Sequence, residues 1–220
     1  MRVHATLPAI PLLRNRMSSL FRNVQFMTSA AKLEQCPEDA GIEIAFAGRS
    51  NAGKSSVLNA LCEQKKLARA SKTPGRTRLL NFFSLDQEQF FRLVDLPGYG
   101  YAKVSHQMRA DWDIMLDDYL SKRASLRMVI LIMDIRHPLQ PFDLRMLHWA
   151  IDAKIALHCV FTKADKITRG AAANTLLTSM KTYEGKPLIT GQTFSSLKKT
   201  GVETLTERLQ ALYGIARETA

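Results

Sequence analysis

The sequence predicts an α/β protein built on a mostly parallel six-stranded sheet, with one antiparallel strand and helices on both faces. Short apolar segments alternate along the chain with helical segments, which is typical of doubly wound sheets. The segment 128–133 is continuously apolar, as in a strand that is covered on both faces. A glycine-rich motif stands directly between the first predicted strand and the helix that follows it.

The predicted elements begin near residue 41. In chain order, they are a strand at 42–47, a helix that runs to about residue 67, strands at 82–85 and 90–94, a helix at 112–120, a strand at 128–133, a helix at 144–151, a strand at 155–161 and a helix at 202–212. The strands at 82–85 and 90–94 read as a hairpin. The helix at 112–120 has apolar residues at the i, i+3, i+4, i+7 spacing that buries one face.

The length of 220 residues suits one medium-sized domain. We expect a disordered extension at 1–20, a lead-in segment at 21–40, the main domain at 41–214 and a flexible tail at 215–220. The three cysteines stand far apart, which argues against a disulfide scaffold or a cysteine-based zinc site. No apolar run approaches the length of a membrane span, so we expect a cytoplasmic monomer with no membrane partner.

The chain carries 31 basic and 20 acidic residues, a formal net charge of +11. Such an excess favours a polyanionic partner, and nucleic acid suits it better than an acidic membrane. The alternative is a lysine-rich surface with no such partner.

The strongest chemical signal is a complete P-loop pattern that follows a strand and opens a helix. Its glycines let backbone N–H groups wrap around phosphate oxygens, and its lysine should reach the β- and γ-phosphates. Its serine hydroxyl should bind Mg²⁺. The predicted phosphate-binding residues are Gly48, Arg49, Ser50, Asn51, Ala52, Gly53, Lys54 and Ser55.

Downstream motifs select guanine over adenine. Thr162-Lys163-Ala164-Asp165 follows a strand, and the Asp165 carboxylate can accept hydrogen bonds from guanine N1–H and N2–H₂. Adenine offers no such pair of donors, so a P-loop ATPase or kinase is disfavoured. A further purine-contacting loop is predicted at Phe194, Ser195 and Ser196.

Two segments are predicted to sense the γ-phosphate. Asp95-Leu96-Pro97-Gly98 has the DxxG form, in which the aspartate holds Mg²⁺ through water and the glycine N–H meets the γ-phosphate. The other segment is the first switch, in which Thr77 supplies a second Mg²⁺ ligand. Its predicted nucleotide contacts are Gly75, Arg76, Thr77, Arg78 and Leu79.

Together these motifs resemble the EngB (YihA/YsxC) family of TrmE-Era-EngA-EngB-Septin-like GTPases. The resemblance spans about residues 21–214 and includes DIRHP at 134–138 and FSSLKK at 194–199. It implies a Ras-like P-loop G domain that binds GTP or GDP with Mg²⁺. It also implies a role in assembly of the large (50S) ribosomal subunit, with rRNA rather than DNA as partner, and a link to cell division and septation.

The predicted catalytic residues are Lys54, Thr77, Gly98 and Asn51. Tyr99 follows the DxxG motif where many small GTPases have a water-orienting glutamine, so we expect slow intrinsic hydrolysis. Related GTPases with asparagine at the position of Asn51 hold K⁺ with its side-chain oxygen; otherwise Asn51 only shapes the loop. A GTP-controlled binding module with negligible turnover remains an alternative function.

Overall fold

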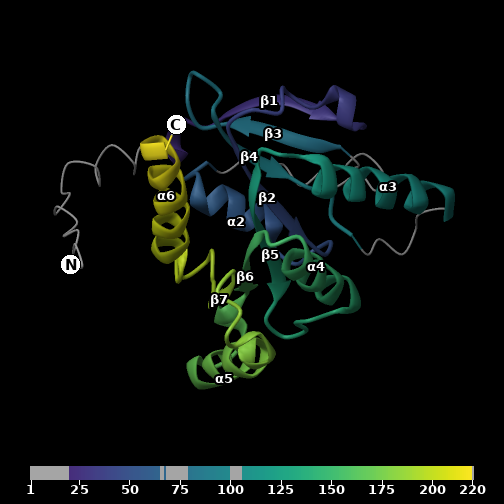
Figure 1. Ribbon diagram of the computed structural model, residues 1–220. Helices are drawn as coiled ribbons and strands as arrows, with labels where there is room; N and C mark the ends of the chain where they lie inside the picture. The colour runs from purple at the N-terminus through teal and green to yellow at the C-terminus, as the bar shows by residue number, and fades with distance from the viewer. Residues whose placement is uncertain (1–19, 65–66, 68–78, 100–105, 220) are drawn as a thin grey trace, which may run out of the picture.

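The computed structural model describes residues 20–64, 67, 79–99 and 106–219, which form a seven-stranded sheet with helices on both faces (Figure 1). The strand order is β1-β3-β4-β2-β5-β6-β7. The strands are β1 (Gln25–Ala30), β2 (Ile42–Gly48), β3 (Leu80–Ser84), β4 (Phe91–Asp95), β5 (Leu126–Asp134), β6 (Ala156–Thr162) and β7 (Ile189–Thr193). The main helices are α2 (Lys54–Leu61), α3 (His106–Lys122), α4 (Pro141–Asp152), α5 (Arg169–Met180) and α6 (Val202–Thr219).

The predicted fold class is confirmed, but the sheet has seven strands where the sequence predicts six. The strand β3 pairs antiparallel with both β1 and β4, and the other pairings are parallel, so β3 is the one reversed strand. The two edge strands, β1 and β7, have no counterpart among the predicted ranges. Edge strands are half exposed and tolerate polar residues, so QFMTSA and ITGQT lack a clear strand pattern.

The helix predicted to reach about residue 67 is shorter than expected. Helix α2 ends at Leu61, and Glu63 then adopts a left-handed backbone conformation with φ 51°. A helix cannot continue through such a residue. At the other end of the domain, α6 continues to Thr219 and so extends into the segment predicted to be a tail.

The alternation of side chains along β2 divides the core into two layers. Ile44 and Phe46 pack on the face covered by α2 and α6, while Ala45 and Ala47 face α3, α4 and α5. All four residues are almost completely buried. Because the parallel strands share one direction, their carboxyl ends meet at the same edge of the sheet, where ligands bind in open α/β folds.

Buried polar groups inside the sheet are paired. His158 on β6 is buried, and its ring nitrogens lie 2.8 Å from Thr190 Oγ1 and 3.0 Å from Gln192 Oε1. Burial, helped by the positive charge of Arg208, lowers the pKa of His158 to about 4. The histidine is therefore a neutral part of the core.

A buried ionic cluster lies at the amino-terminal end of β2. This end is opposite the edge of the sheet at which the carboxyl ends of the parallel strands meet. The Glu43 carboxylate is fully buried and accepts hydrogen bonds from Arg123 Nη2 at 2.7 Å and Nε at 3.0 Å. Arg92 Nη1 and the Tyr119 hydroxyl donate to it at 3.1 and 3.0 Å. Arg123 and Arg92 also donate to the carbonyl oxygen of Glu38, so the cluster fixes the segment before β2 to the domain.

No helix in the described part of the chain is both long and apolar enough to cross a membrane.

Candidate nucleotide-binding site

The P-loop lies between β2 and α2, as predicted. Gly48 ends β2, and a Cβ there would lie only 2.8 Å from the carbonyl oxygen of Ile132, so the position requires glycine. Gly53 precedes α2 with φ 102°, a left-handed conformation that glycine adopts without strain. The loop therefore ends at the amino terminus of α2, where unpaired N–H groups and the helix dipole favour phosphate.

Lys54 and Asp95 come together across the base of this loop. The Lys54 ammonium group forms an ion pair with the Asp95 carboxylate, and both side chains are about 12% exposed. The pair brings the P-loop lysine next to the DxxG aspartate, as both motifs require. A bound phosphate would offer Lys54 a second anionic partner at the same place.

The residues predicted to hold Mg²⁺ fit that ion chemically. Ser55 on the first turn of α2 and Asp95 at the end of β4 offer oxygen atoms, which Mg²⁺ prefers. Among the described residues there is no cluster of three or more metal-binding side chains. In nucleotide sites Mg²⁺ is usually held by one or two protein oxygens together with phosphate oxygens and water. When bound, such an ion neutralises phosphate charge.

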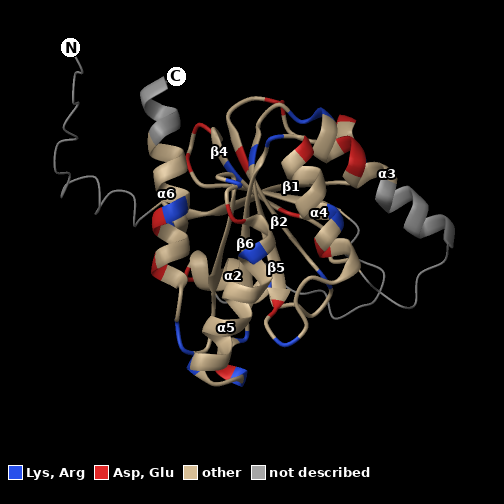
Figure 2. Cartoon of the chain, turned by 60° about the horizontal axis from the view of Figure 1, so that its bottom comes forward, with Lys and Arg blue, Asp and Glu red and all other residues tan. Residues whose placement is uncertain are grey.

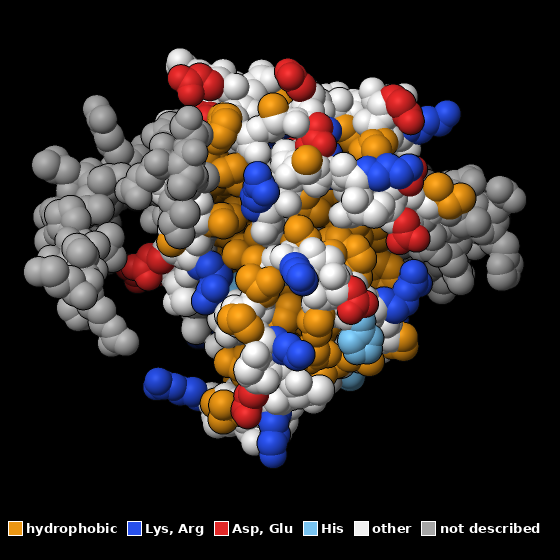
Figure 3. Space-filling view, in the orientation of Figure 1, with side chains coloured by type: hydrophobic (Ala, Val, Ile, Leu, Met, Phe, Trp, Pro, Cys, Tyr) orange, Lys and Arg blue, Asp and Glu red, His pale blue; other side chains and the backbone are white. Residues whose placement is uncertain are grey.

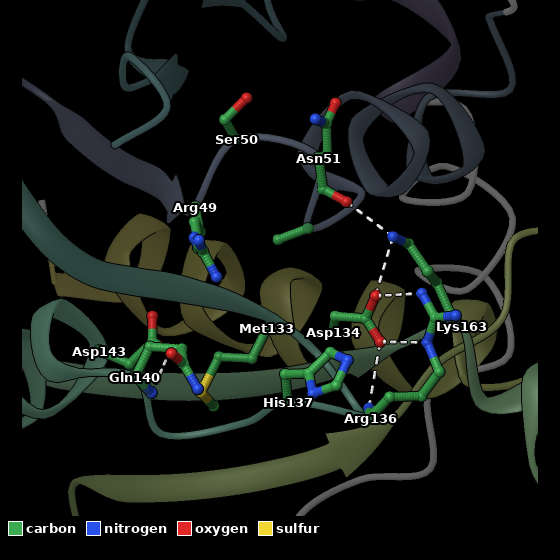
Figure 4. Close-up of a pocket in the computed structure, with 11 residues that line it drawn as sticks. Arg49, Ser50, Asn51, Met133, Asp134, Arg136, His137, Gln140, Asp143 and Lys163 are labelled. Carbon is green, nitrogen blue, oxygen red and sulfur yellow. Dashed lines mark hydrogen bonds and ion pairs between the residues drawn. The ribbon is translucent and has the colours of Figure 1, made fainter. Parts of the chain in front are cut away.

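Asp134 at the end of β5 organises the next part of the site (Figure 4). Its Oδ2 lies 2.9 Å from Lys163 Nζ, and Arg136 donates to both of its oxygens. Lys163 Nζ also donates to the carbonyl oxygen of Asn51 at 2.7 Å. The hydrogen bonds from Arg136, and then from Lys163, hold the pKa of Asp134 well below its usual range. Lys163 is thus fixed over the P-loop, beside a cavity of about 260 Å³.

The Asp165 carboxylate, which is predicted to select guanine, is held in place by the loop after β7. Ser195 Oγ donates to Asp165 Oδ1 at 2.6 Å, and Lys166 Nζ lies 3.8 Å from Oδ2. The bond from Ser195 is the main reason that the pKa of Asp165 is lowered. Ser195 Oγ also accepts from the N–H of Lys198 at 3.1 Å. Asp165 is therefore an ionised acceptor in a fixed position.

Thr162 connects the segment 162–165 to the P-loop, because its hydroxyl donates a hydrogen bond to the carbonyl oxygen of Ala52. The same hydroxyl is also 3.0 Å from the carbonyl oxygen of Met133 on β5. The Phe194 ring lies in the core rather than beside a base, and its carbonyl accepts from the N–H of Ala164 at 3.1 Å. The contribution of Phe194 to the site is thus through its backbone, whereas Ser196 is exposed.

The DxxG segment continues from β4 and lies against the start of the P-loop. Leu96 and Pro97 are buried and Gly98 is half-buried. The hydroxyl of Tyr99, which follows them, donates a hydrogen bond to Asp143 on α4. No amide side chain therefore stands at the position where many GTPases orient water.

The first switch cannot be compared with its prediction, because Gly75, Arg76, Thr77 and Arg78 lie outside the described residues. Leu79, the last predicted contact of that segment, is half-buried just before β3. The structure brings together the predicted contacts at 48–55, 95–98 and 162–165 and at Ser195.

Two further site residues were not identified from the sequence. Asp134 lies in the DIRHP segment, which the sequence analysis used only for the family resemblance, and it positions Lys163. Asp143 lies inside an ordinary amphipathic helix and binds Tyr99. Asp134 could have been identified from the sequence, because it ends a buried strand at the edge of the sheet where ligands bind. The sequence around Asp143 carries no comparable signal.

Comparison with known proteins agrees with this geometry. A family model, MMR_HSR1, described as 50S ribosome-binding GTPase, matches residues 43–163, more than half of the chain. The fold is similar to the crystal structure of a probable GTP-binding protein EngB, with a TM-score of 0.61 and 21% identity over 78% of this chain and 98% of that one.

Two further structures share the fold. The G domain of the T. maritima FeoB iron transporter has a TM-score of 0.51 and 25% identity over 79% of this chain and 98% of that one. The elongation factor SelB from Methanococcus maripaludis, in complex with the GTP analogue GppNHp, has a TM-score of 0.56 and 14% identity over 77% of this chain. This chain matches only 33% of the SelB chain.

The P-loop, the paired Asp165 and the family match lead to one conclusion: the chain belongs to the family of 50S ribosome-binding GTPases, and its Ras-like P-loop domain is a GTP-binding GTPase.

Proposed function

We propose that this protein is a GTP-controlled assembly factor for the large ribosomal subunit, with rRNA as its partner. The observation that carries the proposal is the match to a family described as 50S ribosome-binding GTPase. The motif resemblance to EngB proteins supports the same role and adds a link to cell division and septation. A monomer that works on ribosomal particles belongs in the cytoplasm.

The charge of the chain is compatible with an RNA partner. Exposed basic residues border the guanine-binding loops, namely Lys166, Arg169, Lys198 and Lys199. Figure 2 shows basic residues in the loop that leads into α6. On the face seen in Figure 3, basic and acidic side chains are interspersed rather than gathered in one patch. We therefore favour contacts to RNA phosphates through loops at the nucleotide edge rather than through a flat basic surface.

Co-sedimentation with purified 50S particles tests the proposal. We expect the protein to pellet with 50S particles in the presence of GTP or GppNHp and to remain largely in the supernatant with GDP. Purified 30S particles at the same salt concentration are the control for nonspecific attraction of a +11 protein to RNA. Equal pelleting with both subunits and all nucleotides would contradict the proposal.

We further propose that intrinsic hydrolysis is slow and is stimulated by the ribosome and by K⁺. Tyr99 is turned toward α4 and offers no amide to orient water. Asn51 adopts a left-handed conformation with φ 64°, its carbonyl is bonded to Lys163, and its side chain is exposed at the edge of the P-loop. That exposed amide oxygen is the candidate K⁺ ligand, and a cation held there would offset charge that develops between the β- and γ-phosphates.

Turnover in KCl should exceed turnover in NaCl at equal ionic strength, and Asn51→Ala should abolish the difference. We expect a gain of about tenfold with 50S particles present, below the roughly 10³–10⁵ that an arginine finger supplies elsewhere. The measurement is phosphate release under single-turnover conditions. Identical rates in the two salts, or a full K⁺ response in Asn51→Ala, would return Asn51 to a loop-shaping role. No release under any of these conditions would favour the alternative, a GTP-controlled binding module without turnover.

A further inference from the structure

Tyr99 is fixed to helix α4 along its whole side chain. Its ring stacks on Phe142, with centroids 3.8 Å apart and planes inclined by 25°, and its hydroxyl donates to Asp143. Tyr99 is 6% exposed and Asp143 is 2% exposed. A hydrogen bond to a carboxylate is strong when both partners are shielded from water. We call Tyr99, Phe142 and Asp143 the α4 clasp.

The acceptor in the α4 clasp is itself held rigidly. Asp143 lies in the first turn of α4, and its Oδ2 accepts from the backbone N–H of Gln140 at 2.9 Å, the contact drawn in Figure 4. A carboxylate at this end of a helix is stabilised by the helix dipole. Burial raises the pKa of Asp143, and the hydrogen bonds from Tyr99 and Gln140 oppose that rise. Asp143 is thus a fixed anchor for Tyr99.

The backbone of Tyr99 is bonded to the P-loop. The N–H of Ser50 donates to the Tyr99 carbonyl at 2.8 Å, and the N–H of Tyr99 lies 3.4 Å from the Gly48 carbonyl. Gly98 packs closely on the same residues, since a Cβ there would lie 3.4 Å from Ser50 Cα. P-loop N–H groups are ligands for phosphate oxygens. In this arrangement the N–H of Ser50 is already used by the protein.

The contact between Tyr99 and the P-loop lies where a γ-phosphate is expected. The sequence predicts that the γ-phosphate meets the N–H of Gly98. A phosphate that enters between that group and the P-loop would compete with the Tyr99 carbonyl for the N–H of Ser50 and would separate Gly98 from Ser50. GDP has no γ-phosphate and leaves the contact intact. A ligand shifts such an equilibrium only through its different affinity for the two states.

We propose that the α4 clasp favours binding of GDP over GTP by holding the Tyr99 backbone on Ser50. Asp143 and Phe142 act as positioning residues, since they reach the nucleotide only through Tyr99. The proposal rests on GTP binding and does not depend on the ribosomal role.

The variant Tyr99→Phe tests the clasp, because it removes the hydroxyl and keeps the stacked ring. The dissociation constants of fluorescent GDP and fluorescent GppNHp are measured for full-length wild type and variant. We expect the ratio of the GppNHp constant to the GDP constant to fall by about fivefold or more, through tighter binding of GppNHp. Phe142→Leu, which removes the stacking contact and keeps the hydroxyl, should change the ratio in the same direction.

Tyr119→Phe is the matched control. It also removes a hydroxyl that donates to a buried carboxylate, that of Glu43, but it lies on α3 at the far end of β2. Its thermal stability should fall as in Tyr99→Phe while the ratio of the two constants stays at the wild-type value.

The proposal is overturned if Tyr99→Phe and Phe142→Leu both keep the wild-type ratio, including the case in which both nucleotides weaken equally. A selective loss of GppNHp affinity in these variants would also overturn the proposal. In that case the clasp would favour GTP, because it would hold Gly98 in position for the γ-phosphate. If Tyr99→Phe does not fold, Phe142→Leu alone decides. Failure of wild type to bind either nucleotide would instead contradict the GTPase assignment.

Discussion

Replacing Asp165 with asparagine should weaken GTP binding by about 2–4 kcal/mol, or roughly 30- to 700-fold. The Asp165 carboxylate is fixed by Ser195, and it is predicted to accept hydrogen bonds from two donors of the guanine edge. Asparagine would place an N–H₂ group against one of those donors and would remove the charge that strengthens both bonds. Xanthine has an acceptor at C2 in place of the guanine amino group, so xanthosine triphosphate should bind the variant better than GTP does.

Competition titrations with a fluorescent nucleotide measure this change for both bases. Asp152→Asn is the matched control, since the same substitution is made at an exposed aspartate at the end of α4, outside the site. Its GTP affinity should equal that of wild type. Equal GTP affinity in wild type and Asp165→Asn would show that this carboxylate does not read guanine.

Replacing Glu43 with alanine should lower the free energy of unfolding by about 3–5 kcal/mol. The carboxylate is fully buried and faces two arginines and the Tyr119 hydroxyl. Its removal leaves Arg92 without its ion-pair partner and leaves Arg123 with only Asp39 at 3.6 Å, although both arginines are less than 10% exposed. Because the cluster also fixes the segment before β2, the loss should appear in the global unfolding transition.

Urea denaturation of wild type and Glu43→Ala gives the difference. The control is Glu63→Ala, which removes a carboxylate from the surface pair with Arg22, whose side chains are about 60% exposed. That variant should lose less than about 1 kcal/mol. Comparable losses in the two variants would mean that the buried cluster adds no more stability than a surface ion pair.

The site was predictable from the sequence where its chemistry constrains short stretches of chain. Phosphate binding favours glycine in the loop, and Gly53 has a left-handed conformation that glycine adopts without strain. Recognition of guanine requires a carboxylate just after a strand, and Asp165 stands at such a position. Each constraint is local, and each leaves a readable motif.

The parts that were missed depend on contacts between distant segments or lie at sheet edges. Tyr99 is 44 residues from Asp143, and nothing in the helical pattern of α4 marks an aspartate that will be buried against a tyrosine. Asp134 reaches Lys163 only because β5 and β6 are neighbours in the sheet. The strand β1 is an edge strand whose side chains are partly exposed, so its sequence shows no strand pattern.

We propose that nucleotide in this site controls binding to the large ribosomal subunit. The most direct test is co-sedimentation of wild type and Asp165→Asn with 50S particles in the presence of GTP or xanthosine triphosphate. We expect wild type to pellet with GTP only and Asp165→Asn to pellet with xanthosine triphosphate only. Pelleting of both proteins regardless of the nucleotide, or of neither protein with any nucleotide, would contradict it.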